Sequence, residues 1–204
     1  MREVDFYFDF MSPFAYLAHL RLPDIAKRHG LAISYRPVDL AQLKIEAGNT
    51  GPPNRQVPAK LKYLLEDVAR WADRYGEPFV LPRLDTLDSR LANQGARFVA
   101  KSGAGQSGKM GEFVSLVWRA SFGSGGSMAD KDSLAGIAAS LDLDRHAFLD
   151  FIGSPGADRD LSDRTTEAAQ RGIFGVPTMI VDGLMWWGND RLAFLEDHLA
   201  QDEP

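Results

Sequence analysis

The sequence predicts an α/β fold in which strands from both ends of the chain form one sheet and a helical segment is inserted between them. Apolar and polar residues alternate near each end, whereas the middle, from Pro58 to about Pro155, shows only helical periodicity. A chain of 204 residues is long enough for one core with an insertion. We expect a discontinuous sheet domain of residues 1–40 and 172–204, with residues 41–171 forming a loop and an inserted helical domain.

The first strand and the first helix are expected to meet at Ser12. Phe6, Phe8 and Phe10 alternate with polar residues, which is the period of a strand that presses one face onto a core. Ser12 is a favoured N-cap residue, and Pro13 suits the first helical position, where a missing N–H is harmless. The sequence therefore predicts a strand, a turn at Ser12 and a helix.

A second strand is predicted from Leu31 to Leu40, after a helix that ends near Gly30. A strand, a helix and a strand of this length form a βαβ unit, so the two strands should be parallel, with a right-handed crossover. Residues 39–57 contain the run GNTGPPN, and we expect them to form a loop. The helices that follow are separated by the glycine- and proline-rich segments EPFVLP, SGAGQSG, FGSGGS and GSPGA.

The C-terminal part predicts a hairpin and a final helix. Thr178–Val181 and Leu184–Trp187 are short apolar runs joined by an Asp-Gly pair, which is a strong hairpin signal. A last helix is expected after Gly188, with Asn189 or Asp190 as its cap. This order of elements is that of a thioredoxin-like fold with an inserted all-helical domain.

Composition excludes several classes of function. The formal net charge of -5 and the lack of a long basic run argue against a nucleic-acid binder. No apolar run approaches a membrane span, and the N-terminal residues lack the apolar core of a signal peptide, so we expect a cytoplasmic protein without a membrane partner. The four histidines show no ligand spacing, so we expect no metal site and place them at the surface.

The glycine-rich segment at residues 103–109, GAGQSGK, resembles a phosphate-binding loop. We reject that interpretation because Met110, which has no hydroxyl group for magnesium, follows Lys109. The preceding residues also predict a helix, whereas a phosphate loop needs a strand before it. A connection between helices, or a lid over a cleft, explains the same glycines.

Ser12 is the candidate active-site residue. It stands where thioredoxin-like proteins carry a reactive Cys-x-x-Cys motif, and the unpaired N–H groups of the following helix would stabilise an anion beside it. The chain contains no cysteine, so dithiol chemistry is excluded and any thiol must come from outside. The alternative is that Ser12 only caps the helix.

Three groups of motifs resemble the 2-hydroxychromene-2-carboxylate isomerase family, which is related to kappa-class glutathione transferases and to the bacterial disulfide oxidoreductases. They are FYFDFMSPFAYLA, EAGNTGPPN with the following PAK, and RGIFGVPTMIVDG with WGNDRL. The resemblance implies a glutathione cofactor and a homodimer, for which Trp71 and Trp118 could supply an apolar face. The resemblance also implies the residues that bind the cofactor. Ser12 would donate a hydrogen bond to the glutathione sulfur, Asn49 would hold the glutathione backbone, and the main chain of Val176 would pair with the cysteinyl part, with Pro177 as a cis-proline. Asn189 and Asp190 would hold the γ-glutamyl end.

The implied activity is the glutathione-dependent cis-trans isomerisation of 2-hydroxychromene-2-carboxylate to trans-o-hydroxybenzylidenepyruvate, in bacterial degradation of naphthalene-type aromatics. Such an aromatic substrate carries a carboxylate, so we expect Lys44 and Lys60 to hold it and Phe14, with Tyr16, Trp186 and Trp187, to contact its ring. Two alternatives stay open. One is a kappa-like glutathione transferase or peroxidase acting on other electrophiles, and the other is a non-catalytic thioredoxin-like module that binds peptides.

Overall fold

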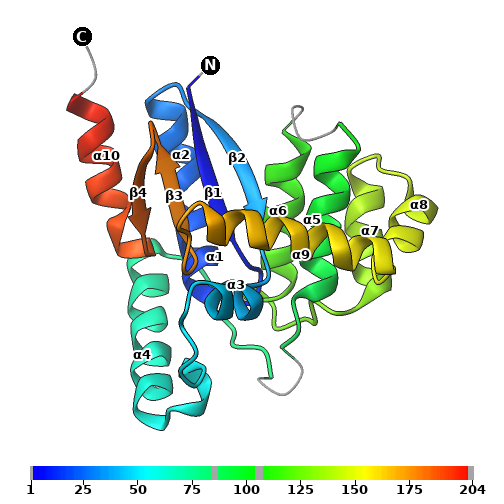
Figure 1. Ribbon diagram of the computed structural model, residues 1–204, viewed down its shortest axis with the longest axis horizontal. Coiled ribbons are helices and arrows are strands. Elements are labelled where there is room, and N and C mark those ends of the chain that lie inside the picture. Colours follow the sequence, from blue (N-terminus) through cyan, green and yellow to red (C-terminus); the bar gives the residue numbers. More distant parts are fainter. Residues whose placement is uncertain (1, 84–86, 104–107, 202–204) are drawn as a thin grey trace.

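A four-stranded sheet with strand order β2-β1-β3-β4 lies at the centre of the computed structural model, which describes residues 2–83, 87–103 and 108–201 (Figure 1). The strands are β1 (Glu3–Phe8), β2 (Ala32–Pro37), β3 (Thr178–Val181) and β4 (Leu184–Trp187). β1 is parallel to β2 and antiparallel to β3, and β3 is antiparallel to β4. The predicted α/β fold, parallel βαβ unit and C-terminal hairpin are therefore confirmed.

Ten α-helices surround the sheet within the described residues. Two short 3₁₀ segments, Asn54–Gln56 and Asn189–Arg191, precede α4 and α10. The helices are α1 (Pro13–His19), α2 (Leu22–Arg28), α3 (Leu40–Glu46), α4 (Pro58–Tyr75), α5 (Arg90–Lys101), α6 (Lys109–Ala120), α7 (Lys131–Ser140), α8 (Arg145–Phe151), α9 (Pro155–Gln170) and α10 (Leu192–Gln201).

The N-terminal half differs from the prediction in two places. The single helix expected between the first strands is two helices, α1 and α2, because Pro23 lies in the first turn of α2 and has no N–H to continue α1. Residues 40–46, expected in a loop, form α3. Asp39 caps this helix by accepting hydrogen bonds from Ala41 N and Gln42 N, and the glycine- and proline-rich run begins only after it ends.

Helices cover both faces of the sheet, although the sequence predicted only one buried face. Phe6 and Phe8 point from β1 into a large apolar core shared with α1, α2, α10 and the helices α5–α8. On the opposite face Tyr7, with 4% of its surface exposed, packs with Val38 and Ala168 beneath α3 and α9. The division at residues 41 and 171 stays a prediction, but these two helices from within the expected insertion pack against the sheet (Figure 1).

The middle of the chain is helical, as predicted. The glycine-rich segment follows α5, a helix, and leads into α6, which begins at Lys109, so no strand aims it as a phosphate loop requires. Residues 104–107 of that segment lie outside the described residues. Over the ranges that the structure describes, no helix is long and apolar enough to cross a membrane.

The strand directions bring four distant parts of the chain to one end of the sheet. β1 and β2 run towards this end, β3 starts there and β4 returns to it, since Tyr7, Thr178 and Trp187 lie side by side across three strands. The segments that begin with Ser12, Asp39, Val176 and Asn189 therefore meet at the same edge as α4, which projects from the lower end of the sheet in Figure 1.

Candidate active site

Ser12 caps α1 through its side-chain oxygen. The backbone N–H of Ala15 donates to Ser12 Oγ at 3.2 Å, and Ser12 N donates to the main-chain oxygen of Asp9 at 2.9 Å. The oxygen thus accepts within the helix, and the hydroxyl proton remains available as a donor. Capping the helix and donating to a bound anion are therefore compatible roles for one side chain.

Ser12 opens on a cavity of about 460 Å³, a volume in the range of small-molecule sites. Five other residues predicted from the sequence line the same cavity: Phe14, Lys44, Asn49, Val176 and Trp187. These residues come from α1, from α3 and the loop after it, from the segment before β3 and from β4. The structure therefore places the predicted catalytic residue together with about half of the predicted binding residues, whose roles stay predictions.

Lys44 is a cation of the cavity wall whose pKa is lowered by its surroundings. Burial, and then the positive charge of Lys60, lower the pKa of Lys44. Within the part of the chain that the structure describes, Lys44 forms no ion pair, so its charge is available to an anionic ligand. Lys60 is exposed on the first turn of α4 and does not line the cavity, although its charge is felt by Lys44. Arg55, which sequence reasoning missed, adds a second cation to the wall.

Much of the cavity lining is apolar. Trp187 packs edge-to-face on Phe174, with ring centroids 4.9 Å apart, and both line the cavity. The indole covers Gly175 so closely that a Cβ atom there would lie 2.8 Å from Trp187 Nε1. Glycine is therefore required at this position. Leu61, Leu64, Leu65, Leu81, Leu87 and Phe122 complete the apolar lining.

Two of the aromatic residues expected to contact the substrate lie elsewhere. Tyr16 is 2% exposed in the core, where its hydroxyl donates to the main-chain oxygen of Pro78. Trp186 packs on His198 of α10. Trp118, expected on a face covered by a partner, is fully buried within the chain and donates to Phe10 O. Helical periodicity could not separate the leucines of α4 that line the cavity from residues of a closed core, because both follow the same spacing.

Asn189 and Asp190 line a neighbouring cavity of about 310 Å³ rather than the one beside Ser12. Neither caps a helix as expected, since they lie in the 3₁₀ segment that begins after Gly188. Asn189 is 2% exposed, and its Oδ1 accepts a hydrogen bond from the hydroxyl of Tyr75 at 3.1 Å. Its Nδ2 is buried and has no hydrogen-bond partner among the described residues. A buried amide donor without a protein partner is costly, so a water or ligand acceptor at this point would stabilise it.

The predicted cis peptide bond is present between Val176 and Pro177. Val176 lines the Ser12 cavity, whereas Pro177 is buried behind it.

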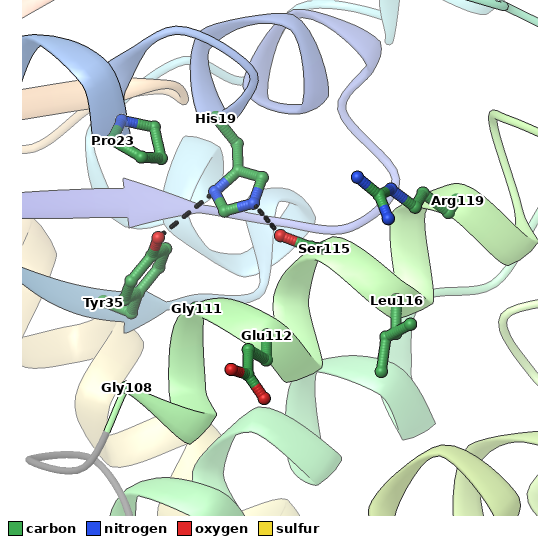
Figure 2. A pocket seen from close by; sticks show the side chains of 9 residues that line it. All are labelled: His19, Pro23, Tyr35, Gly108, Gly111, Glu112, Ser115, Leu116 and Arg119. Atoms are coloured by element: carbon green, nitrogen blue, oxygen red, sulfur yellow. Dashed lines mark hydrogen bonds between the residues drawn. The ribbon is translucent and has the colours of Figure 1, made fainter. Parts of the chain in front are cut away.

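His19 is buried, although the sequence suggested a surface position. It borders a third cavity, of about 470 Å³, between α2 and α6 (Figure 2). Its Nε2 lies 2.7 Å from the hydroxyl of Ser115, and its Nδ1 lies 3.3 Å from that of Tyr35. Burial, and then the charge of Arg119, lower the pKa of His19 to about 3. So weak a base is a poor proton acceptor for Ser115, and we assign the three side chains a structural role.

Comparison with known proteins identifies the family. The sequence matches the family described as DSBA-like thioredoxin domain over residues 3–200. It is also 41% identical over 198 residues to the 2-hydroxychromene-2-carboxylate isomerase of Sphingobium xenophagum, covering 97% of this chain and 98% of that protein. The chain belongs to the 2-hydroxychromene-2-carboxylate isomerase family.

The structural comparison agrees with this assignment. A solved 2-hydroxychromene-2-carboxylate isomerase superposes with a TM-score of 0.84 at 42% identity, over 97% of this chain and 94% of that one. The protein named glutathione S-transferase kappa 2 of Caenorhabditis elegans is a more distant relative, 27% identical over 210 residues, which cover 98% of this chain and 92% of that protein. The family relationship to kappa-class transferases expected from the motifs is thus confirmed.

Proposed function

We propose that the protein is a glutathione-dependent isomerase that interconverts 2-hydroxychromene-2-carboxylate and trans-o-hydroxybenzylidenepyruvate. The observation that carries the proposal is that the Ser12 hydroxyl, at a helix N-terminus, and the ammonium group of Lys44 line one cavity. The first is suited to a thiolate and the second to a carboxylate. Relatives that are 41% and 44% identical and bear the name of this isomerase support the same substrate.

Ser12 would hold the sulfur of glutathione. When bound, glutathione would supply a thiolate that adds to the conjugated double bond, lets it rotate as a single bond and is then eliminated unchanged. The Ser12 hydroxyl would donate to the sulfur while its oxygen still accepts from Ala15 N, and the N–H groups of α1 would add their partial positive charge. Both effects favour the thiolate over the thiol, so they raise the fraction of cofactor that is reactive at neutral pH.

The peptide part of the cofactor would extend from Ser12 along the end of the sheet. Asn49 and the main chain of Val176 lie on the same cavity wall, in agreement with the contacts expected for the middle of glutathione. The γ-glutamyl end carries both an ammonium and a carboxylate group. The cavity at Asn189 and Asp190 supports this fit, because Arg21 and Arg74 line it together with the Asp190 carboxylate. A carboxylate placed there would satisfy the buried amide of Asn189.

Lys44 would bind the substrate carboxylate, with Arg55 beside it and Lys60 just outside the wall. The aromatic ring would lie against the apolar side formed by Phe14, Phe174 and the leucines of α4, which exclude water from the reacting bond. In this arrangement the carboxylate of the substrate would contact the cations and its aromatic ring would contact the apolar residues.

A kappa-like transferase is the second candidate, favoured by the large apolar share of the cavity wall and by the kappa-named relative. The same thiolate would then attack other electrophiles. A peptide-binding module without catalysis is the third reading, and it predicts no affinity for glutathione.

The proposal includes a homodimer and a cytoplasmic location. Leu184 and Met185 on β4, an edge strand, and Phe194 on α10 are exposed, which supports pairing of two chains through this side. Reduced glutathione is a cofactor of reducing compartments, which supports the cytoplasm.

The decisive experiment is a double-bond isomerisation assay on 2-hydroxychromene-2-carboxylate with and without glutathione. We expect turnover only with glutathione, and glutathione binding by calorimetry in the absence of substrate. Binding without isomerisation, together with conjugation of a model electrophile, would favour the transferase. No heat and no thermal shift at millimolar glutathione would contradict both enzymes.

A further inference from the structure

The carboxylate of Asp9 is buried beneath the Ser12 cavity, with 1% of the residue exposed, and the proposed chemistry gives it no role. Burial raises the pKa of this carboxyl, and the hydrogen bonds that it accepts oppose the rise. A buried carboxylate without a cation beside it is costly unless each of its acceptor sites is used. It accepts four hydrogen bonds, all from neutral donors: Met11 N at 3.0 Å, Leu40 N at 2.8 Å, Ser89 Oγ at 2.5 Å and Asn93 Nδ2 at 3.0 Å.

The four donors come from three segments: the turn before α1, the start of α3, and the start of α5, which carries Ser89 and Asn93. Met11 precedes Ser12, and Leu40 is the first residue of α3, one helical turn before Lys44. Met11, Leu40, Ser12 and Lys44 all line the cavity. The two carboxylate oxygens of Asp9 bind different segments: Oδ1 accepts a hydrogen bond from Met11 N, and Oδ2 accepts one from Leu40 N. One side chain thus links the segment that carries the hydroxyl to the helix that carries the cation.

We propose that Asp9 is a positioning residue, which joins Met11 to Leu40 and so sets the position of Lys44 relative to the Ser12 hydroxyl. This inference rests on the proposed function, in which Ser12 holds the thiolate and Lys44 holds the substrate carboxylate. A reaction between two bound molecules depends on such spacing, since small displacements of a positioning group reduce the rate strongly.

Helix α3 has other anchors, so loss of the Asp9 bond would shift it rather than unfold it. Its N-terminus keeps the cap from Asp39, whose own N–H donates to Thr165 Oγ1 at 2.9 Å. Gln42 Nε2 also donates to the hydroxyl of Ser162 at 3.0 Å. The bond to Asp9 therefore ties the start of α3 to the segment that follows β1, whereas the other hydrogen bonds named here tie α3 to α9.

Asp9→Asn tests the inference with little change of shape. An asparagine whose oxygen replaces Oδ1 still accepts from Met11 N, but its amide group then faces the N–H of Leu40. The amide group of residue 9 and the N–H of Leu40 are both donors, so the hydrogen bond to α3 is lost. The bond from Ser12 N to the main-chain oxygen of residue 9 does not involve the side chain and is kept.

We expect Asp9→Asn to raise the KM for the carboxylated substrate about tenfold, equivalent to ~1.4 kcal/mol. The pKa of bound glutathione should stay at its wild-type value, because Ser12 is not moved. In a Lys44→Ala background the same change should raise KM no further, since the cation that it positions is gone. An unchanged KM, or a thiol pKa that shifts along with KM, would overturn the inference.

Ser89→Ala is the matched control. It removes another donor to the same carboxylate but leaves the bond to Leu40 N, so it should lower the melting temperature without changing KM. An equal rise of KM in both variants would show a general loss of packing and refute the positioning role. Should Asp9→Asn fail to fold, Leu40→Pro removes that N–H donor at a first helical position that accepts proline, and Leu40→Ala, which keeps the N–H, controls for the loss of the leucine side chain from the cavity wall. A larger rise of KM in Leu40→Pro than in Leu40→Ala is then expected.

A binding measurement keeps this inference separate from the isomerase proposal. Calorimetry with trans-2-hydroxycinnamate, an aromatic carboxylate, measures the site without turnover. Weaker binding in Asp9→Asn than in wild type supports the positioning role even where no isomerase activity is found. Equal binding in the two proteins overturns it even where the wild type is an active isomerase.

Discussion

Replacing Ser12 by alanine separates its role as a helix cap from its proposed role as a donor to a thiolate. A free glutathione thiol has a pKa of about 8.5, so only a few per cent is ionised at neutral pH. A hydrogen bond to a charged group contributes about 1.5 to 3 kcal/mol, which corresponds to about one to two pKa units. The N-terminus of α1 adds about 0.3 to 1 kcal/mol. We therefore expect the bound thiol to have a pKa of about 6 to 7 in the wild type.

In Ser12→Ala the hydroxyl is lost and the helix end remains, so the pKa of the bound thiol should return to about 8. Turnover at pH 7 should then fall about tenfold from the smaller thiolate fraction alone. Raising the pH should restore part of the lost turnover, because a larger fraction of the bound thiol is then ionised without the hydrogen bond from Ser12. Glutathione should still bind, since the proposed contacts of its peptide part are with Asn49 and Val176.

The assay is a titration of thiolate ultraviolet absorbance in the two glutathione complexes, alongside thermal unfolding. Loss of the bond from Ala15 N to Ser12 Oγ should cost about 1 kcal/mol of stability whatever the chemistry. Ser154→Ala is the matched control, because Ser154 caps α9 in the same way through Ala157 N at 3.1 Å. Overlapping titration curves for wild type and Ser12→Ala, with equal losses of stability in both variants, would leave Ser12 as a cap alone.

Three further predictions test other residues and the assembly. Lys44→Ala should raise the KM for the carboxylated substrate more than Lys60→Ala does, because Lys44 lines the cavity and Lys60 does not. The affinity for glutathione should be unchanged in both variants. A larger rise of KM in Lys60→Ala would make Lys60 the residue that binds the substrate carboxylate. Burial lowers the pKa of His19 from 6.5 to about 3, so the unfolded chain binds the proton more readily. The contribution of His19 to stability should be complete above pH 6.5 and fall below it by about 1.4 kcal/mol per pH unit, a slope that urea titrations should show reduced in His19→Gln; an equal slope in the two proteins would contradict the prediction. Sedimentation should give a dimer at micromolar concentration, and a monomer would contradict the proposed pairing.

The parts of the fold that were predictable depend on local chemistry. The Asp-Gly turn between β3 and β4 and the capping signal at Ser12 act within a few residues, so the sequence shows them directly. The extra helix α3 was missed because the proline- and glycine-rich run after it dominated the interpretation of the whole loop. Its own cap, Asp39, was a usable signal.

The site was predictable from motifs only in part. Ser12, Lys44 and Asn49 carry recognisable signals, and the structure brings them together. Asp9 occupies a polar position of an alternating strand, so its pattern predicts exposure, whereas helices from the middle of the chain bury it. Arg55 lies in a 3₁₀ segment of three residues, which is too short for periodicity to mark it. Both residues acquire their surroundings from long-range contacts that no local pattern encodes.

The net charge of the whole protein is negative, whereas the charged side chains that line the cavity are positive. A net charge of -5 would disfavour two anionic ligands, glutathione and an aromatic carboxylate, if the charges acted over the whole surface. At physiological ionic strength the screening length is about 8 Å, so charges lining a partly closed cavity act more strongly on a bound ligand than distant surface carboxylates do. Lys44 and Arg55 lie in the wall, and Lys60 lies close enough to lower the pKa of Lys44. The local excess of cations would therefore favour binding of the two proposed ligands. Burial, and then the ammonium group of Lys60, lower the pKa of Lys44, and a bound carboxylate would oppose both effects because it stabilises the charged form of the lysine.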